Sequence, residues 1–233
     1  MPARRGTRLA VAVAATFVVA ATAWALVQAV AAPTSEQRVE LPGAGAAVSI
    51  EVDQGDVDVR AGAAAGRVSA RAEVRAPGVD PARSTAVDDG EARLSWSCRF
   101  WTTCRVDVRA DVPDDARVRV RTSFGDVRVA GPVGDVDIET GSGDVEATSI
   151  AGGRATVRAR SGGARLAFDR RPSDVDVEVT SGDITLDVPA GAYRITAETR
   201  AGDVVLDGVR DDPAAPGSIL LDTTAGDVVV RGR

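Results

Sequence analysis

Apolar and polar residues alternate with a period of two through most of the second half of this chain. Around a recurring glycine, the residues two and four positions later and those five and seven positions earlier are apolar. The residues between them are mostly Asp, Glu, Arg or Thr. Alternation of this kind, rich in β-branched side chains, is typical of half-buried strands. The pattern therefore predicts an all-β domain in which every unit contributes two strands.

The glycines mark a repeat, because a Gly-Asp-Val or Gly-Asp-Ile step returns about every 20 residues. Successive anchors are 18, 19, 20, 20 and 24 residues apart, at Gly125, Gly143, Gly162, Gly182, Gly202 and Gly226. Glycine suits a turn that needs a positive φ, and the Asp after it can accept a hydrogen bond from a neighbouring backbone N–H. We predict repeat turns at Gly125, Asp126, Gly143, Asp144, Gly182, Asp183, Gly202, Asp203, Gly226 and Asp227.

Two architectures satisfy units built as strand, tight turn, second strand and looser return. In a β-solenoid, which resembles a parallel β-helix, each unit is one coil of about 20 residues, and equivalent residues stack from coil to coil. In a hairpin sandwich, the two strands of each unit pair antiparallel across the turn. The near-constant unit length favours the solenoid, because coils must match in perimeter.

Residues 45–120 keep the alternation but lose the regular spacing. Strands are predicted around 68–74, 94–98 and 106–108, with a loop over 76–90. We interpret this part as an irregular N-terminal β cap over the first coil, because the exposed end of a solenoid requires one. At the other end the chain stops directly after a strand, so we expect that open edge to pair with another subunit. The sequence itself sets no oligomeric state.

Residues 9–32 form an apolar run that precedes the repeats. Its length suffices for one transmembrane helix. Because three arginines precede the run, we expect a cytoplasmic N-terminus and an extracytoplasmic C-terminal domain at the plasma membrane. A cleaved signal peptide is the alternative, since Ala29-Val30-Ala31 fits the small-residue cleavage pattern. Both alternatives export the domain.

The first alternative gives four parts. Residues 1–8 are a short cytoplasmic tail, 9–32 a single-pass anchor in the lipid bilayer, 33–44 a linker, and 45–233 the extracytoplasmic β-repeat domain.

Cys98 and Cys104 are the only two cysteines. In an exported protein a closely spaced pair is most simply a disulfide, which would staple the neck of a hairpin between two predicted strands. The intervening loop contains Phe100 and Trp101, in a chain with few aromatic residues. An exposed pair of this kind could contact a partner or a lipid headgroup. The alternative is that one or both fold back onto the core of the cap.

Composition narrows the functional classes. All 28 basic residues are Arg, no His is present, and the formal net charge is −6. An acidic exterior argues against nucleic-acid binding, because that function requires clustered positive charge. Without His or Lys, neither a Ser-His-Asp nor a Cys-His arrangement exists, and the amine nucleophile is missing. We therefore expect no enzymatic activity, no catalytic residues and no cofactor.

The turn acids raise the question of a metal. Stacked carboxylates could attract Ca²⁺, which takes 6–8 oxygen ligands. The calcium-binding repeat pattern, with several glycines and an Asp in nine residues, is missing from this sequence. A zinc site needs four ligands, and the chain has no His to supply them. We expect no metal and take each Asp to cap its own turn, with calcium as the alternative.

Units such as Val177-Glu178-Val179-Thr180-Ser181-Gly182-Asp183-Ile184 resemble the bacterial putative-adhesin family of β-strand repeats, which carries a domain of unknown function. The resemblance covers roughly residues 45–233 and is strongest from 118 onward. Relatives often follow a single membrane anchor, and the Ala-, Val- and Arg-rich composition looks actinobacterial. The resemblance implies adhesin-like proteins or envelope-stress signalling, and no catalytic residues transfer.

We therefore expect a non-enzymatic cell-envelope surface protein that presents a rigid β-repeat scaffold, adhesin-like, to an envelope polymer. The alternative is an envelope-stress or ligand-sensing module. Because the cytoplasmic tail is so short, such a module would act through a membrane-protein partner.

Overall fold

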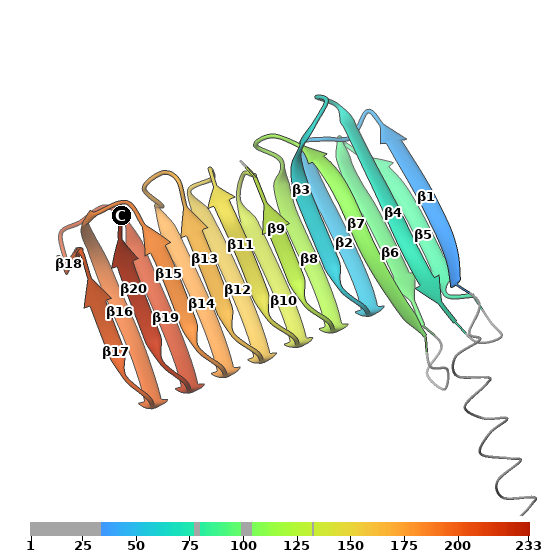
Figure 1. Cartoon of the computed structure of the whole chain (residues 1–233). Coiled ribbons are helices and arrows are strands. Elements are labelled where there is room, and N and C mark those ends of the chain that lie inside the picture. The colour runs from blue at the N-terminus through green and yellow to red at the C-terminus, as the bar shows by residue number, and fades with distance from the viewer. Residues whose placement is uncertain (1–33, 77–79, 99–103, 132) are drawn as a thin grey trace, which may run out of the picture.

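Each repeat unit folds as one coil, in which a strand of one sheet is followed by a corner and a strand of the other sheet. The computed structural model describes residues 34–76, 80–98, 104–131 and 133–233, which form twenty strands and no helix. The strands make two ten-stranded sheets, and together they form an elongated stack (Figure 1).

Sheet A contains the strand after each corner. In spatial order it comprises β1 (Thr34–Pro42), β4 (Arg67–Arg75), β7 (Arg105–Pro113), β3 (Val57–Ala63), β9 (Val127–Ala130), β11 (Val145–Ile150), β13 (Ala164–Phe168), β15 (Ile184–Val188), β20 (Val228–Gly232) and β17 (Val204–Asp207).

Sheet B contains the strand before each corner. In the opposite spatial order it comprises β18 (Val209–Asp211), β16 (Gly191–Ala201), β19 (Ser218–Ala225), β14 (Asp174–Ser181), β12 (Arg154–Ser161), β10 (Val136–Ser142), β8 (Arg117–Phe124), β2 (Ala47–Gln54), β6 (Glu91–Ser97) and β5 (Ala82–Asp88).

The pairing confirms the β-solenoid prediction. β10 pairs in parallel with β8 on one side and with β12 on the other, and the same holds for β11 between β9 and β13. The hairpin alternative is wrong, because the two strands of a unit lie in different sheets and do not pair.

The interior is filled by the predicted alternate positions, which stack in rows from coil to coil. One row runs through Val118, Val136, Ala155, Val175 and Ile219, each at most 2% exposed. Full burial of one Val, Leu or Ile side chain contributes roughly 1.5–3 kcal/mol. Because the same positions are apolar in every unit, the core is continuous along the stack.

The spatial order of the coils departs from the order in the sequence. From the end that we call proximal to the end that we call distal, the coils are β6–β7, β2–β3, β8–β9, β10–β11, β12–β13, β14–β15, β19–β20 and β16–β17. The last coil of the chain, β19–β20, thus lies between β14–β15 and β16–β17. The prediction of an open edge at the C-terminal strand is wrong, because β20 pairs with a strand on each side.

The prediction of an irregular cap over residues 45–120 is only partly right. β2–β3 and β6–β7 lie in this range and are coils of the stack. The proximal end is closed instead by β1 and β4 on sheet A and by β5 on sheet B, and both β4 and β5 run antiparallel to their coil strands. β5 occupies part of the predicted loop over 76–90; its residues are all exposed, so it lacks the alternation that reveals a strand.

The predicted linker over residues 33–44 is also wrong. Thr34–Pro42 is strand β1, which pairs with β4 along its whole length. Val39 and Leu41 pack against the core, while Glu36 and Arg38 are exposed and form an ion pair. Two aliphatic residues are too short a pattern to distinguish a strand from a polar linker.

Cys98 and Cys104 form a disulfide, with their Cα atoms 5.8 Å apart. It does not staple a hairpin, because β6 before it belongs to sheet B and β7 after it belongs to sheet A. The disulfide instead closes the loop at the corner of the proximal coil, where most other coils have Gly-Asp. Phe100 and Trp101 lie outside the described residues.

The predicted anchor over residues 9–32 also lies outside the described residues. Within the part of the chain that the structure describes, no helix has the length and apolar character needed to cross a membrane.

Removing the corner disulfide should lower stability moderately. The double variant Cys98→Ser/Cys104→Ser is expected to lose about 2 kcal/mol of unfolding free energy, because the unfolded chain regains the entropy of a short closed loop. Chemical denaturation followed by far-UV circular dichroism measures this loss. Reduced wild type is the matched control and should coincide with the variant, whereas equal stability of oxidised wild type and variant would contradict the assignment.

Candidate functional site

The corners at which the coils turn from sheet B to sheet A line up as a ridge along the stack. We call it the corner ridge, and its members share one position, directly after the corner glycine or its equivalent. From the proximal to the distal end they are Asp107, Asp56, Asp126, Asp144, Gly163, Asp183, Asp227 and Asp203.

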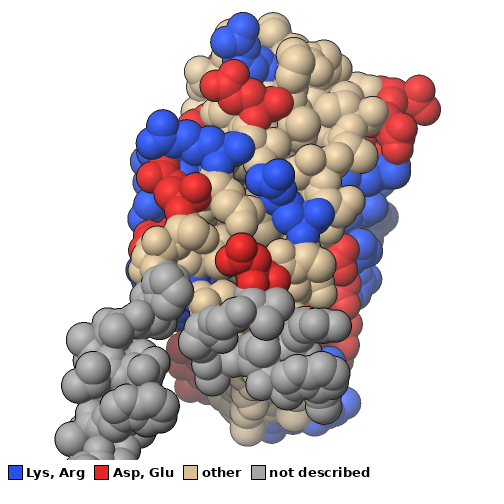
Figure 2. All heavy atoms as spheres, turned by 90° about the vertical axis from the view of Figure 1, so that its right-hand side faces the viewer, with Lys and Arg blue, Asp and Glu red and all other residues tan. Residues whose placement is uncertain are grey.

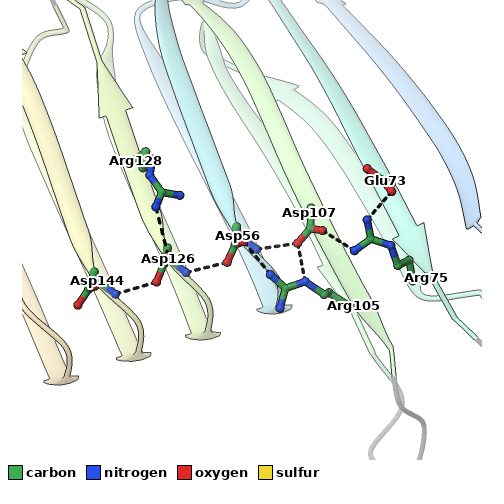
Figure 3. A network of polar contacts seen from close by, with 8 residues as sticks. All are labelled: Asp56, Glu73, Arg75, Arg105, Asp107, Asp126, Arg128 and Asp144. Carbon is green, nitrogen blue, oxygen red and sulfur yellow. Dashed lines mark hydrogen bonds and ion pairs between the residues drawn. The ribbon is translucent and has the colours of Figure 1, made fainter. Parts of the chain in front are cut away.

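Each ridge carboxylate that has a coil beyond it binds that coil. Oδ1 of Asp126 accepts the backbone N–H of Asp144 with an N···O distance of 3.0 Å (Figure 3). Equivalent bonds of 2.8–3.0 Å join the other neighbours wherever a carboxylate is present. The prediction that each Asp caps its own turn is therefore wrong, because donor and acceptor lie in different coils. Hydrogen bonds to a charged group contribute about 1.5–3 kcal/mol each.

The corner glycines permit this close stacking. Gly143 has a φ of 135°, a conformation that L side chains rarely adopt. A Cβ atom at Gly143 would also overlap the carbonyl oxygen of Gly125 in the preceding coil, and the other corner glycines face the same contact. Both the backbone angle and the inter-coil contact therefore require glycine.

At the proximal end the corner ridge is neutralised by arginines. Arg105 bridges two members, with Nη2 2.7 Å from Asp56 Oδ2 and Nε 2.9 Å from Asp107 Oδ1 (Figure 3). Arg75 links Asp107, at 3.1 Å, to Glu73, at 2.6 Å. Partial burial of the Arg105 guanidinium opposes its charge, but the attraction of Asp107 and Asp56 raises its pKa. These contacts connect the corners of coils β6–β7 and β2–β3 to each other and to β4.

The corner ridge has one gap. Gly163 occupies the Asp position, so its coil receives a bond from Asp144 but offers no carboxylate to the next coil. Among the described residues, the backbone N–H of Asp183 consequently has no acceptor. A hollow of about 290 Å³ opens beside the gap and is lined by Asp144, Arg165 and Asp183, among others.

A larger groove lies beside the corner ridge on sheet B, and we call it the outer groove. It has a volume of about 450 Å³ and crosses β2, β8, β10 and β12. Small residues, Ser123 and Gly141, lie at its centre. Its lining residues are Glu51, Val52, Asp53, Arg121, Thr122, Ser123, Phe124, Glu139, Thr140, Gly141, Ser142, Arg160 and Ser161.

The outer groove offers several polar groups that are not engaged elsewhere. Among the described residues, Glu51 and Arg160 form no ion pair, whereas Arg121 and Glu139 pair at 3.2 Å. Phe124 is 57% exposed at a corner position where neighbouring coils have Gln or Ser. Carboxylates, guanidinium groups and hydroxyls next to an exposed ring can bind a polar polymer by hydrogen bonds and stacking.

Behind the same groove, the side chains of Thr122 and Thr140 face the interior, and their buried hydroxyls have no hydrogen-bond partner among the described residues. At the equivalent position of the two distal coils, Thr223 and Thr199 donate their hydroxyls to the corner carbonyls of Gly182 and Gly226 at 3.1 and 2.9 Å. Unsatisfied buried hydroxyls are uncommon and cost free energy, so the core behind the groove differs from the core of the two distal coils.

The structure places all ten predicted turn residues at the corners between the sheets. Sequence reasoning missed Asp107, because no glycine precedes it, and did not include Asp56 although Gly55 carries the motif. It also missed the outer groove, which brings together residues of four coils. The one available signal was Phe124, an aromatic residue in a slot that is otherwise small or polar.

Calcium was the alternative interpretation of the turn acids. Among residues 34–76, 80–98, 104–131 and 133–233, no group of three His, Cys, Asp or Glu side chains is placed to hold a metal ion. The ridge carboxylates are instead engaged as acceptors of backbone N–H groups.

Comparison with known proteins identifies the architecture. Residues 41–230 match the family described as Toastrack DUF4097. No curated protein matches the sequence. Among solved structures, the chain is similar to a putative cell adhesion protein from Clostridium sporogenes, with 11% identity, a TM-score of 0.52, and coverage of 86% of this chain and 100% of that chain. This likeness shows the fold alone.

The chain is also similar to a putative adhesin from Bacteroides fragilis, with 13% identity, a TM-score of 0.45, and coverage of 86% of this chain and 97% of that chain. A TM-score this low carries no argument.

Two adjacent glycines in one corner should differ in their response to substitution. Gly162→Ala is expected to lower the unfolding free energy by about 3 kcal/mol, because its Cβ meets the Gly143 carbonyl at an unfavourable φ. Gly163→Asn should be more stable than Gly163→Ala by about 1 kcal/mol, because its side-chain oxygen can accept the free N–H of Asp183 without adding charge.

Denaturant titration of the three variants measures both effects. A Gly162→Ala variant as stable as wild type, or equal stability of the Asn and Ala variants, would contradict the account of the corner.

Proposed function

This chain belongs to the Toastrack DUF4097 family, and from that premise we propose that it is a non-enzymatic, adhesin-like protein of the cell envelope. Its β-solenoid serves as a rigid scaffold that holds the outer groove against an envelope polymer. We further propose that residues 9–32 anchor the chain in the plasma membrane and that the repeat domain is extracytoplasmic.

The outer groove is the observation that carries the proposal. It crosses four coils that are locked to one another by the corner ridge, so its polar groups keep fixed spacings along the stack. Glu51 and Arg160, which form no ion pair among the described residues, come from the two outermost of these coils. An extended, polyhydroxylated glycan could lie between them and stack a ring on Phe124.

The environment of the acids supports binding rather than catalysis. Glu139 is paired with Arg121, and its side chain is 62% exposed. Asp53 accepts hydrogen bonds from the Ser97 hydroxyl and the Cys98 N–H at 3.1 and 2.8 Å. A catalytic carboxylic acid is usually desolvated, which holds its proton at neutral pH. The groove is open, and its acids are solvated or already engaged.

The disulfide supports the extracytoplasmic location. Disulfides persist in oxidising compartments outside the cytoplasm and are rare within it. The pair at Cys98 and Cys104 closes a corner of the stack and is therefore structural.

Binding of an envelope glycan should depend on the outer groove. Full-length protein in detergent is tested against purified cell-wall glycans and a glycan array. Phe124→Ala is expected to weaken binding by about 3–10-fold, the loss expected for one stacking contact. Arg160→Ala should weaken it further for an acidic glycan.

Arg194→Ala is the matched control, because Arg194 is exposed on sheet B in the distal coil, away from the groove. No bound glycan, or equal binding by all variants, would overturn the glycan assignment. Release of shortened glycan chains during incubation would overturn the non-enzymatic assignment.

A further inference from the structure

The two ends of the stack are chemically different. The proximal end is closed by β1, β4 and β5 and carries ion pairs, including Glu36 with Arg71 and Arg93 with Asp88. Figure 2 looks onto this end and shows acidic and basic side chains spread over the part left in view. At the distal end, three consecutive aliphatic residues of β17 are exposed: Val204 at 42%, Val205 at 46% and Leu206 at 41%.

From β2–β3 onward, each coil is joined to its distal neighbour by the same set of corner bonds, except that the coil with Gly163 lacks the carboxylate acceptor. In coil β8–β9, the Gly125 and Val127 N–H groups donate to Ser142 and Asp144 carbonyls at 2.8 and 2.9 Å. The Asp144 N–H donates back to Asp126 Oδ1 at 3.0 Å. One coil thus offers two backbone donors and one carboxylate acceptor to its distal neighbour.

The same set of bonds joins the last two coils of the stack. Coil β19–β20 donates from Gly226 and Val228 to Ala201 and Asp203, each at 2.9 Å, and Asp203 N–H donates to Asp227 at 2.9 Å.

Coil β16–β17 has the same two backbone donors and the same carboxylate acceptor on its distal side, where no further coil follows. Among the described residues, no partner meets the N–H groups of Gly202 and Val204 or the carboxylate of Asp203. The distal coil therefore presents the complete bonding pattern for one more coil.

The start of that further coil is already present. β18 pairs in parallel with the first three residues of β16, on the side away from β19. Asp211 then accepts the N–H of Ile195 at 3.0 Å, which ends the pairing. From there the chain leaves the position and returns to form β19–β20 inside the stack. The open position therefore runs along the rest of β16, around the corner and along β17.

We propose that this open coil position binds an extended peptide segment of a partner protein that carries the pattern of the repeat itself. The segment has aliphatic residues at alternate positions on both sides of a Gly-Asp corner. Its backbone pairs with β16 and β17, and its aliphatic residues cover Val204 and Leu206. Strand addition of this kind takes its affinity from main-chain hydrogen bonds and its specificity from alternate side chains.

The structure specifies the corner residue of the peptide. A Cβ on any corner glycine would overlap the carbonyl oxygen of the preceding corner, so the residue that faces Gly202 must be glycine. The Asp203 carboxylate is placed to accept the backbone N–H of the peptide residue that follows this glycine. A second copy of the chain offers no such corner at its proximal end, which antiparallel strands and ion pairs close.

The test uses a fluorescent peptide with the sequence of residues 174–188, which form one coil of the stack and are acidic. Full-length protein in detergent is titrated against it and followed by fluorescence anisotropy. Saturable binding is expected, and the matched peptide with Gly182→Ala should bind at least tenfold more weakly. Absence of binding, or equal binding of the two peptides, would overturn the proposal.

Two protein variants separate peptide binding from folding. Asp203→Ala removes an acceptor that has no partner among the described residues, so the melting temperature should stay unchanged while the peptide binds about tenfold more weakly. Asp227→Ala is the control for a carboxylate within the stack, and it should lower the melting temperature.

Unchanged peptide affinity in Asp203→Ala would overturn the proposal. Sedimentation showing a dimer that Leu206→Ser dissociates would also overturn it, because a second copy would then occupy the distal end.

Discussion

The close approach of successive corners is the constraint on which this structure depends. Each corner glycine lies against the carbonyl oxygen of the preceding corner, where no side chain fits. This approach brings the next residue's carboxylate within hydrogen-bond distance of the following coil, as in the pair Asp126 and Asp144. The aliphatic rows follow from the same registration, because coils that meet in register at the corner also superpose their strands. The charged outer faces add little, since cross-coil pairs such as Arg119 with Asp137 are exposed to water.

The structural features that could be predicted from the sequence are those encoded within one repeat unit. Period-two alternation identifies the strands and their inner faces, and the Gly-Asp step marks the corners. The solenoid followed from the nearly equal length of the units.

The remaining features depend on contacts between units. The spacing of 24 residues before Gly226 is a local sign of extra residues in front of β19–β20, but it does not reveal that this coil lies between β14–β15 and β16–β17. β1 and β5 were missed for a related reason, because an edge strand with few buried positions shows little alternation. The outer groove exists only when four coils stand side by side.

The similarity of the corners also explains the order of the coils and the unpaired groups at the distal end. Because the corners share nearly the same bonding pattern, coils can stack out of sequence order, and the distal coil is left with that pattern unused. The groove and the hollow on the surface lie where the repeat deviates. Phe124 replaces a small or polar residue and borders the outer groove, and Gly163 replaces the ridge carboxylate and leaves a hollow. A rigid stack with such local deviations is suited to presenting a surface.

Amide hydrogen exchange at the corner ridge, resolved by NMR, tests this account most directly. The backbone N–H groups of Asp126, Asp144 and Asp227 should exchange slowly, because carboxylates of the preceding coils hold them. The N–H of Asp183, which faces Gly163, should exchange fast although it occupies the same position in its coil. Equal exchange rates at all four amides would contradict the inter-coil ladder on which the account rests.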